Sequence, residues 1–150
     1  MDVTLAVLAD YANISQEGKL NIMGVFDAIY AENFPTIHTE MKLVVQYEAG
    51  AADGQATHQI EIQLMDADGR KPMVINGQVG VGEVHAGFPV KANSILNIRN
   101  AQFEGPGDFV FNILVDGVVK HQVPLKVLRL AKPLQPSMPP IPPIPPISQN

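Results

Sequence analysis

The sequence predicts an all-β protein built as a two-sheet antiparallel β-sandwich of about eight strands, followed by a proline-rich tail. Three observations support this fold class. Apolar and polar residues alternate with a period of two along several segments, as in strands with one buried and one solvated face. No segment shows the apolar spacing of a helix, and charged residues make up only 17% of the chain. At 150 residues, the chain has the length of one domain with a sizeable core.

Period-two alternation places the strands near residues 3–11, 19–31, 41–48, 57–65, 72–81, 90–99, 108–114 and 118–128. Three of these strands have a clear apolar face. The expected core residues are Met41, Leu43, Val45 and Tyr47 in the third strand, Ile60, Ile62 and Leu64 in the fourth, and Val90, Ala92, Leu96 and Ile98 in the sixth. We therefore expect a β-sandwich domain over residues 1–132 and an extended or disordered tail over residues 133–150.

The first two strands flank the polar stretch NISQEG, whose Asn, Ser and Gly are typical turn residues. The apolar set of the first strand is Leu5, Val7, Ala9 and Tyr11. Matching this set to the second strand favours a four-residue loop, Ile14–Glu17, with Tyr11 opposite Leu20 and Ala9 opposite Ile22. The side chains of Asp10 and Asn13 are then expected to cap amides of the turn.

The segment 19–31 is long for one strand, and Gly24 and Asp27 interrupt its pattern. A glycine inside a strand often marks a bulge or a bend. We therefore expect a bend near Gly24 that lets this strand serve both sheets.

The pair Asp68-Gly69 predicts a tight hairpin. It lies between an even-numbered and an odd-numbered apolar set, so a two-residue loop brings like faces together. We expect a type I′ turn, with Leu64 opposite Met73 and Ile62 opposite Ile75.

The pair Asp116-Gly117 predicts a different turn, because the apolar sets on both sides of it are odd-numbered. A three-residue loop, 115–117, with Gly117 in a left-handed conformation keeps both sets on one face. This geometry places Ile113 opposite Val119 and Phe111 opposite His121.

Composition excludes several classes of chemistry. The chain has no cysteine, which excludes disulfides, thiolate catalysis and Cys-based zinc sites. A net charge of −5 argues against nucleic acid as a partner. The four cations near the end of the last strand have no interleaved aromatics and predict a solvated strand edge: Lys120, Lys126, Arg129 and Lys132. No signal-peptide pattern and no membrane-spanning apolar run is found, so we expect a cytoplasmic protein without a membrane partner.

Motifs for catalysis or for metal and cofactor binding are weak. The segment DADG at 66–69 resembles the start of a calcium loop but lacks the later oxygen ligands, so we interpret it as a turn. The glycines of residues 77–87 lack the spacing and the following helix of a phosphate loop. The histidines show no metal spacing, and we expect His58 and His121 to be rim or core residues bonded to the backbone. The sequence therefore predicts no cofactor, no metal and no catalytic residue.

Two alternative functions remain open. A site for a small ligand or a carbohydrate would use the loops 31–39 and 82–89, through Tyr30, Phe34, His38, His85 and Phe88. Carbohydrate is disfavoured because the chain has no Trp to stack on a sugar ring. An enzyme would use Asp10, Glu17 or the pair of His38 and Glu40, and it requires these side chains to converge.

Three segments resemble a bacterial family catalogued only as a domain of unknown function: LADYANISQEGKLNIMGVFDAIYAENFPTIHTEMKLVV, LMDADGRK and FEGPGDFVFNILVDGVVKHQVPLKV. The resemblance covers about residues 3–128, implies a β-sandwich, and brings no activity, cofactor or catalytic residue. Separately, GPGDFVF at 105–111 is similar to the corner that enters the sixth strand of immunoglobulin-like domains. Phe109 lacks the Tyr hydroxyl that bonds backbone in such corners, so this likeness is one of shape. On this basis we expect an immunoglobulin-like sandwich.

The tail PLQPSMPPIPPIPPISQN has eight prolines in 18 residues and no charge. In a polyproline II helix, with about three residues per turn, the Pro-Pro-Ile repeats form an apolar ridge. Ile141, Ile144 and Ile147 form this ridge, and the prolines beside it, Pro140, Pro143 and Pro146, are expected to take part in docking. A disordered, non-specific tail is the alternative. The leading hypothesis is therefore a non-enzymatic protein-binding or assembly module whose tail docks on a protein partner or on another copy of the chain.

Overall fold

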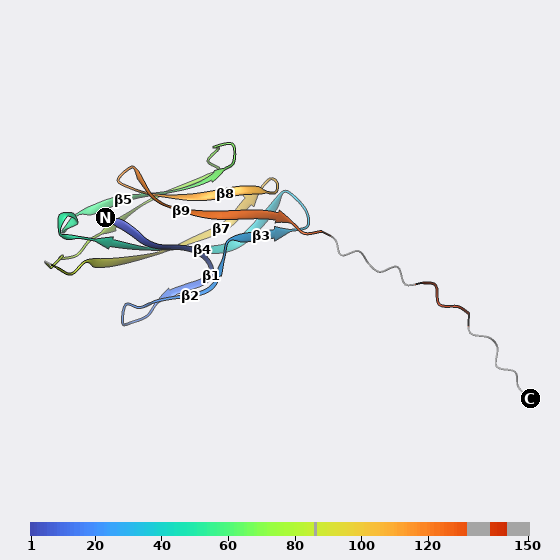
Figure 1. Ribbon diagram of the computed structural model, residues 1–150, viewed down its shortest axis with the longest axis horizontal. Coiled ribbons are helices and arrows are strands. Elements are labelled where there is room, and N and C mark those ends of the chain that lie inside the picture. The colour runs from blue at the N-terminus through green and yellow to red at the C-terminus, as the bar shows by residue number, and fades with distance from the viewer. Residues whose placement is uncertain (86, 132–138, 144–150) are drawn as a thin grey trace, which may run out of the picture.

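The computed structural model describes residues 1–85, 87–131 and 139–143, and it is an all-β structure (Figure 1). Within these residues the one helical segment is a three-residue 3-10 helix, η1 (Ala51–Asp53). The strands are β1 (Asp2–Ile14), β2 (Leu20–Phe26), β3 (Ala28–Ala31), β4 (Thr36–Ala49), β5 (Thr57–Asp66), β6 (Met73–Gly80), β7 (Val90–Phe103), β8 (Gly107–Val115) and β9 (Val118–Arg129).

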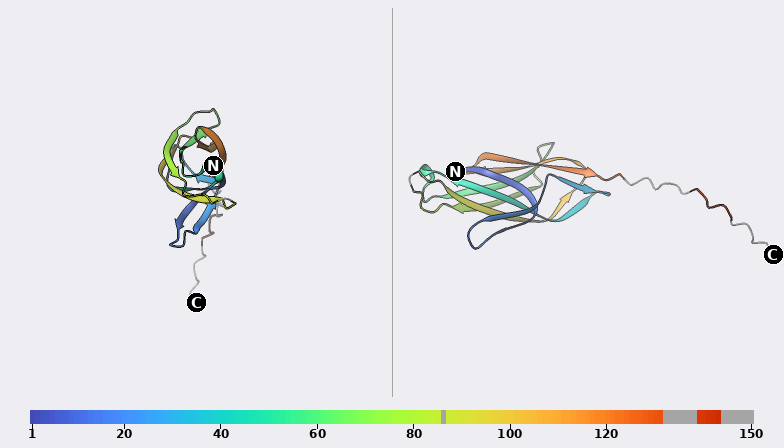
Figure 2. Two further views of the ribbon diagram at one scale, coloured as in Figure 1. Left: turned by 90° about the vertical axis from the view of Figure 1, so that its left-hand side faces the viewer. Right: turned by 60° about the horizontal axis from the view of Figure 1, so that its bottom comes forward.

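The strands form two sheets that pack around one core. Sheet A has the order β2-β1-β4-β7, and sheet B has the order β3-β9-β8-β5-β6. All neighbouring strands are antiparallel except β3 and β9, which are parallel. Viewed end-on, the strands enclose the core as a flattened ring, and the β1–β2 hairpin projects from it (Figure 2). The predicted two-sheet, all-β architecture is therefore confirmed.

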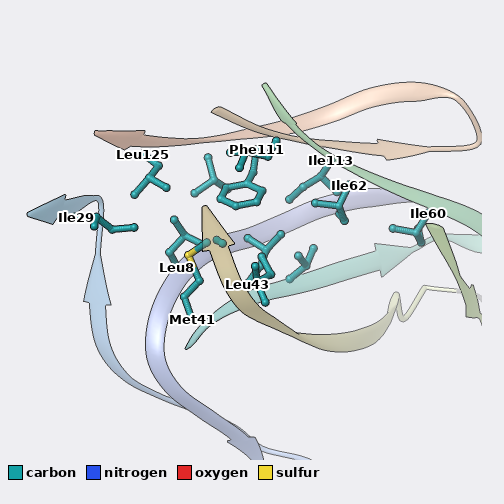
Figure 3. Close-up of a cluster of buried hydrophobic side chains, with 14 of the residues drawn as sticks. Leu8, Ile29, Met41, Leu43, Ile60, Ile62, Phe111, Ile113 and Leu125 are labelled. Atoms are coloured by element: carbon teal, nitrogen blue, oxygen red, sulfur yellow. The ribbon is translucent and has the colours of Figure 1, made fainter. Parts of the chain in front are cut away.

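The core lies between the two sheets (Figure 3). Sheet A contributes Leu8, Met41 and Leu43, and sheet B contributes Phe111 and Leu125, all of them fully buried. The apolar faces predicted for residues 41–47 and 60–64 point into this core, because alternate residues of a half-buried strand must turn to the same side.

After a bulge, β1 turns Ala6 and Leu8 toward the core, whereas the sequence favoured the odd-numbered set that includes Val7 and Ala9. Leu8 pairs with Leu43 and Ala6 pairs with Val45 on the core side, so Val7 and Tyr11 face outward. Every position from Leu5 to Ala9 is apolar, so alternation alone cannot choose the buried face. The pairing with β4, including a bulge between Val3 and Leu5, makes the choice.

The β1–β2 turn is also different from the prediction. Ile14 pairs with Leu20, Tyr11 pairs with Met23, and Gly18 is left-handed with φ of 78°. The loop therefore has three residues, 16–18, because Gly18 supplies the left-handed position of a bulged turn. The side chain that caps this turn is Ser15 rather than Asp10 or Asn13: its Oγ accepts the N–H of Lys19 at 3.1 Å, and its carbonyl accepts the N–H of Gly18 at 2.9 Å.

The segment 19–31 serves both sheets, as predicted. β2 lies in sheet A and β3 lies in sheet B, with Asp27 between them. Gly24 is left-handed with φ of 69° inside β2. The carbonyl of Asp27 accepts the N–H of Lys126 at 2.8 Å, which attaches the crossing point to β9.

The register predicted for the β5–β6 hairpin is confirmed, but its turn type is wrong. Leu64 pairs with Met73 and Ile62 pairs with Ile75. Gly69 alone is left-handed, with φ of 81°, and its N–H donates to the Asp66 carbonyl at 3.1 Å. A type I′ turn requires two left-handed residues, so this is the three-residue, bulged form.

The β8–β9 hairpin has the type I′ turn instead. Asp116 and Gly117 are both left-handed, with φ of 50° and 81°, and Val115 pairs directly with Val118. A bulge between Ile113 and Leu114 then shifts the register, so that Ile113 lies opposite His121 rather than Val119. The bulge restores the common face that a three-residue loop was expected to provide.

The cations near the end of β9 do not follow one free edge. Lys126 lies where β9 pairs with β8 on one side and β3 on the other, and Arg129 pairs with Ala31 of β3. Lys120 lies farther back and forms an ion pair with Asp2 at 3.0 Å. Lys132 lies outside the described residues. The predicted solvated edge is therefore wrong for the part of β9 that β3 covers.

Candidate functional site

The two loops expected to form a ligand site lie at opposite ends of the molecule. Tyr30, Phe34 and His38 lie where β3 leads into β4, and residues 36–39 already belong to β4. His85 and Phe88 lie beyond the other end of β4, before Val90, which pairs with Ala49. The 14 residues of β4 span roughly 45 Å between the two loops. The five residues therefore do not form one site.

At the β3–β4 end, aromatic residues are used for packing. Phe34 packs against the core, and the guanidinium of Arg129 lies 4.9 Å above its ring. Arg129 Nη1 also donates to the Glu32 carbonyl at 3.1 Å. The His38 ring lies 5.9 Å from the Phe26 ring. Tyr30 is exposed on the outer face of sheet B, beside Leu128.

At the opposite end, the loop 82–89 forms a shallow hollow with η1. A bridge between His85 and Phe88 closes the loop, with the Phe88 N–H donating to the His85 carbonyl at 3.0 Å. The hollow has a volume of about 280 Å³ and is also lined by Gly50 and Ala51. Phe88 is 75% exposed beside it.

The residues proposed for an enzyme do not converge. Asn100, opposite Thr39, is left-handed with φ of 53°. In β4 the side chains that face inward are even-numbered before this point, as at His38, and odd-numbered after it, as at Met41. His38 consequently packs beside Phe26 in the interior, while Glu40 lies outside, bonded to Lys42 at 2.9 Å and to Arg99 at 3.5 Å. The hydrogen bond from Lys42, with its positive charge, lowers the pKa of Glu40. Asp10 lies in β1 and Glu17 in the turn that follows it, and the ion pairs of Glu40 are to Lys42 and Arg99 instead.

A polar pair that the sequence did not predict joins β5 to the β8–β9 turn. His58, which is buried, places Nδ1 2.7 Å from Asp116 Oδ2, and the Gln59 N–H donates to Asp116 Oδ1 at 2.9 Å. These two hydrogen bonds lower the pKa of Asp116. His58 is therefore bonded to a carboxylate rather than to the backbone as expected. The two residues are 58 positions apart in the chain, so no local motif could reveal the pair.

The segment DADG forms a turn that uses its own oxygens. Asp66 Oδ1 accepts the N–H groups of Asp68 and Arg70 at 2.9 Å each, and the Arg70 guanidinium reaches Asp66 Oδ2 at 2.9 Å. Desolvation raises the pKa of Asp66, but these donors outweigh it and the net pKa lies below the ordinary value. The turn forms one wall of a cleft of about 540 Å³, and Gly105 and Pro106 belong to the other wall. The turn interpretation of this segment therefore agrees with its geometry.

An apolar cavity of about 80 Å³ lies inside the molecule where β6 and β7 face each other. Its lining includes Val45, Ile62, Ile75 and Leu96. Tyr47 is its aromatic member, and burial raises the pKa of the Tyr47 hydroxyl to about 12 although Ser94 bonds to it.

The β1–β2 hairpin carries a group of exposed apolar side chains on the outer face of sheet A. Beyond Ala9, β1 no longer pairs with β4, so residues 10–24 form a two-stranded arm that stands clear of the body (Figure 1). Tyr11, Met23 and Val25 are 50%, 64% and 61% exposed. Single exposed apolar residues are common, but three neighbours on one face form a candidate interaction surface.

Part of the proline-rich tail is described. Pro140, Ile141 and Pro143 are exposed, and Ile141 is 82% exposed. The other predicted docking residues, Ile144, Pro146 and Ile147, lie outside the described residues.

Two further properties concern only the described part of the chain. There, no three His, Asp or Glu side chains are close enough together to hold a metal ion. Residues 1–85, 87–131 and 139–143 also contain no helix that is long and apolar enough to cross a membrane.

Comparison with known proteins gives a family but no activity. A model described as a family of unknown function, DUF6941, matches residues 4–128. No curated protein matches the chain. Among solved structures, the chain is similar to an alkylpurine DNA glycosylase, AlkC, of Pseudomonas fluorescens bound to DNA containing an abasic site analog, with 13% identity and a TM-score of 0.43. The match covers 82% of this chain and only 30% of that one, and a likeness this weak carries no conclusion about function.

Proposed function

Because the chain belongs to DUF6941, a family of unknown function, we propose its role from its own surfaces: a non-enzymatic protein-binding or assembly module. In this proposal the two sheets form an immunoglobulin-like β-sandwich in the cytoplasm. The sandwich carries a tail, residues 133–150, that docks on a protein partner or on another copy of the chain. The proposal includes no cofactor, no nucleic acid and no membrane.

The observation that carries this proposal is the exposure of apolar residues in a segment without charge. Ile141 is 82% exposed, and the 18 residues of the tail include no Asp, Glu, Lys or Arg. A segment that only keeps a protein in solution is normally rich in charged or small polar residues. Proline-rich segments instead bind apolar grooves at low entropic cost, because the polyproline II conformation is preformed.

Deletion of residues 133–150 tests the proposal. We expect the truncated chain to keep the melting temperature of the full chain but to lose partners in a pull-down, or to lose a higher oligomer in light scattering. A matched variant replaces Ile141, Ile144 and Ile147 by Gln and keeps every proline, so it removes the ridge without changing the stiffness of the segment. If both variants keep the partners and the oligomeric state of the full chain, the tail has no docking role.

A second candidate function is a small-ligand or carbohydrate site, now restricted to one loop. The observation in its favour is the hollow beside Phe88, whose ring is free to stack on a flat or sugar-like ligand. A glycan array and a thermal-shift screen, each with the Phe88→Ala variant as control, test it. Hits that Phe88→Ala does not weaken would place the ligand elsewhere.

A further inference from the structure

Strand β2 is an edge strand without the features that protect such edges. Its sequence, LNIMGVF, contains no charged residue and no proline. Its inner side pairs with β1, and among the residues that the structure describes no strand of sheet A pairs with its other side. Edge strands in soluble proteins normally carry Lys, Pro or an inward charge, because free backbone groups can pair with another strand.

The other sheet edges differ from β2. β7 carries Lys91 and Arg99, and β3 has only four residues. β6 is uncharged, but it follows Pro72. Its free side faces β7 across the apolar cavity described above. β2 instead lies on the projecting arm, where a second strand can approach without meeting the body of the molecule (Figures 1 and 2).

The backbone of β2 offers a defined set of free groups. The Ser15 N–H donates to the Lys19 carbonyl at 2.8 Å, which makes this pair a hydrogen-bonded pair of the β1–β2 ladder. In an antiparallel ladder such pairs alternate with non-bonded ones, so every second residue of β2 presents its N–H and C=O to the free side. By this alternation the positions are Leu20, Ile22, Gly24 and Phe26, and the backbone departs from regular strand geometry at Gly24, whose φ is 69°.

The charges beside β2 are arranged for pairing with a second copy of the chain. Lys19 lies four positions before Met23, and Asp27 lies four positions after it. We propose that two copies pair through antiparallel β2 strands about a two-fold axis at Met23, which joins the two A sheets into one continuous sheet. Each Lys19 then lies opposite Asp27 of the second copy, and both ends of the strand pair are neutralised. In the single chain, Lys19 forms an ion pair with Glu17 in which both side chains are exposed. Replacing this pair by one with Asp27 of the second copy costs little free energy.

The same register covers the two exposed apolar side chains of β2, Met23 and Val25. Met23 packs against Met23 of the second copy, and Val25, now 61% exposed, lies opposite Asn21. On the other face, Ile22 lies opposite Gly24, whose missing side chain leaves room for it. This pairing uses no residue of the tail, so it is independent of the docking role proposed above.

A cysteine at the proposed axis gives the most direct test. The chain has no cysteine, so in the full-length Met23→Cys variant a disulfide can form only between two copies. Residues facing each other in a non-bonded antiparallel pair have Cα atoms about 4.5 Å apart, within the range of about 4.4–6.8 Å that a disulfide bridges. We expect mild oxidation to convert most of this variant into a covalent dimer on a non-reducing gel. The control, Ile37→Cys at a similarly exposed position on β4, stays monomeric.

A charge exchange tests the register. In light scattering and sedimentation of the full chain, Lys19→Asp and Asp27→Lys should each raise the dimer dissociation constant roughly tenfold, because each places like charges opposite one another twice. The double variant restores opposite charges and should return to within about threefold of the wild type. These positions are exposed, so the variants keep the fold.

The outcomes separate this proposal from the tail proposal. A dimer that persists after deletion of residues 133–150 and responds to the charge exchange supports pairing through β2. A wild-type chain that is monomeric at every concentration, or a dimer in which the double variant is no better than the single ones, overturns it. If the dimer disappears when residues 133–150 are deleted and is unaffected by Lys19→Asp and Asp27→Lys, the β2 pairing is overturned and docking of the tail is supported.

Discussion

Single residues in left-handed conformations determine much of this fold. Gly24 allows β2 to bend before the chain crosses to sheet B, and Asn100 changes which residues of β4 and β7 face inward. Asp116 completes a type I′ turn and also bonds to His58. L-residues other than Gly, Asn and Asp adopt this conformation at a cost of about 1–2 kcal/mol, so the identities at these positions are constrained.

Replacing Gly24 by alanine should destabilise the protein more than the same change at Gly69. Both residues are left-handed, and the conformational cost is about 1–2 kcal/mol at each. A Cβ at position 24 would lie 2.6 Å from Asp10 Oδ2, whereas position 69 has open space. Urea unfolding of the two variants measures the difference. Equal losses, or no recovery when Asp10→Ala is added to Gly24→Ala, would contradict the steric explanation.

The contact between Asp116 and His58 should make stability depend on pH. Because the pKa of Asp116 is lowered in the folded state, its carboxylate stabilises the fold above its ordinary pKa of 3.8, and this contribution disappears as the pH falls through the folded value. Asp116→Asn keeps a residue that tolerates the left-handed turn. We expect it to be less stable than wild type at neutral pH, and the difference to shrink in acid. Urea unfolding at both pH values tests this, and a constant difference would rule it out.

At the scale of elements, regular strands were predictable, whereas the turn types of the hairpins were not. Met41, Leu43, Val45 and Tyr47 alternate with polar residues, so periodicity alone gave the buried face of β4. β1 is apolar on both faces, and only its long-range pairing with β4 selects Leu8. The turn predictions were wrong for a related reason. A two-residue loop would put the apolar sets of β8 and β9 on opposite faces, but the bulge between Ile113 and Leu114 returns them to the same face.

The candidate interaction surfaces were also only partly predictable, because their positions depend on long-range strand pairing. Exposed Ile141 lies in a segment that composition marked out, but the arm is visible only once Tyr11 and Met23 are known to face outward. The loop 31–39 leads directly into β4, but the end of β4 at which the loop 82–89 lies depends on the long-range pairing of Val90 with Ala49, which the sequence does not reveal.

The short strand β3 depends on one side chain of β9. Arg129 stacks on Phe34 and bonds to the Glu32 carbonyl. Arg129→Ala should cost about 1 kcal/mol and speed hydrogen exchange in β3. Arg129→Lys keeps the charge but loses the planar stacking. Its stability and its exchange rate in β3 should lie between those of wild type and Arg129→Ala. Exchange followed by mass spectrometry measures the effect, and unchanged protection of β3 in Arg129→Ala would refute it.

At the scale of the whole molecule, the core is closed at its centre and loosens where β6 and β7 face each other. Phe111 is fully buried between the sheets, and Ile75 is half-buried at the cavity. Phe111→Ala should cost about 3–5 kcal/mol and Ile75→Ala about 1–2 kcal/mol, since the second site already has free space and partial solvation. Chemical denaturation of both variants provides the comparison, and a larger loss at Ile75 would show that the opening is closed in solution.

The crossing of the chain at Asp27 also sets how the molecule responds to force. β3 and β9 are parallel, and the arm enters β3 at the end opposite to that where the tail leaves β9. A pull between the arm and the tail therefore loads the β3–β9 hydrogen bonds in shear, all at once, rather than opening them one after another. A protein held by both surfaces at the same time would resist extension along the direction in which its partners are joined.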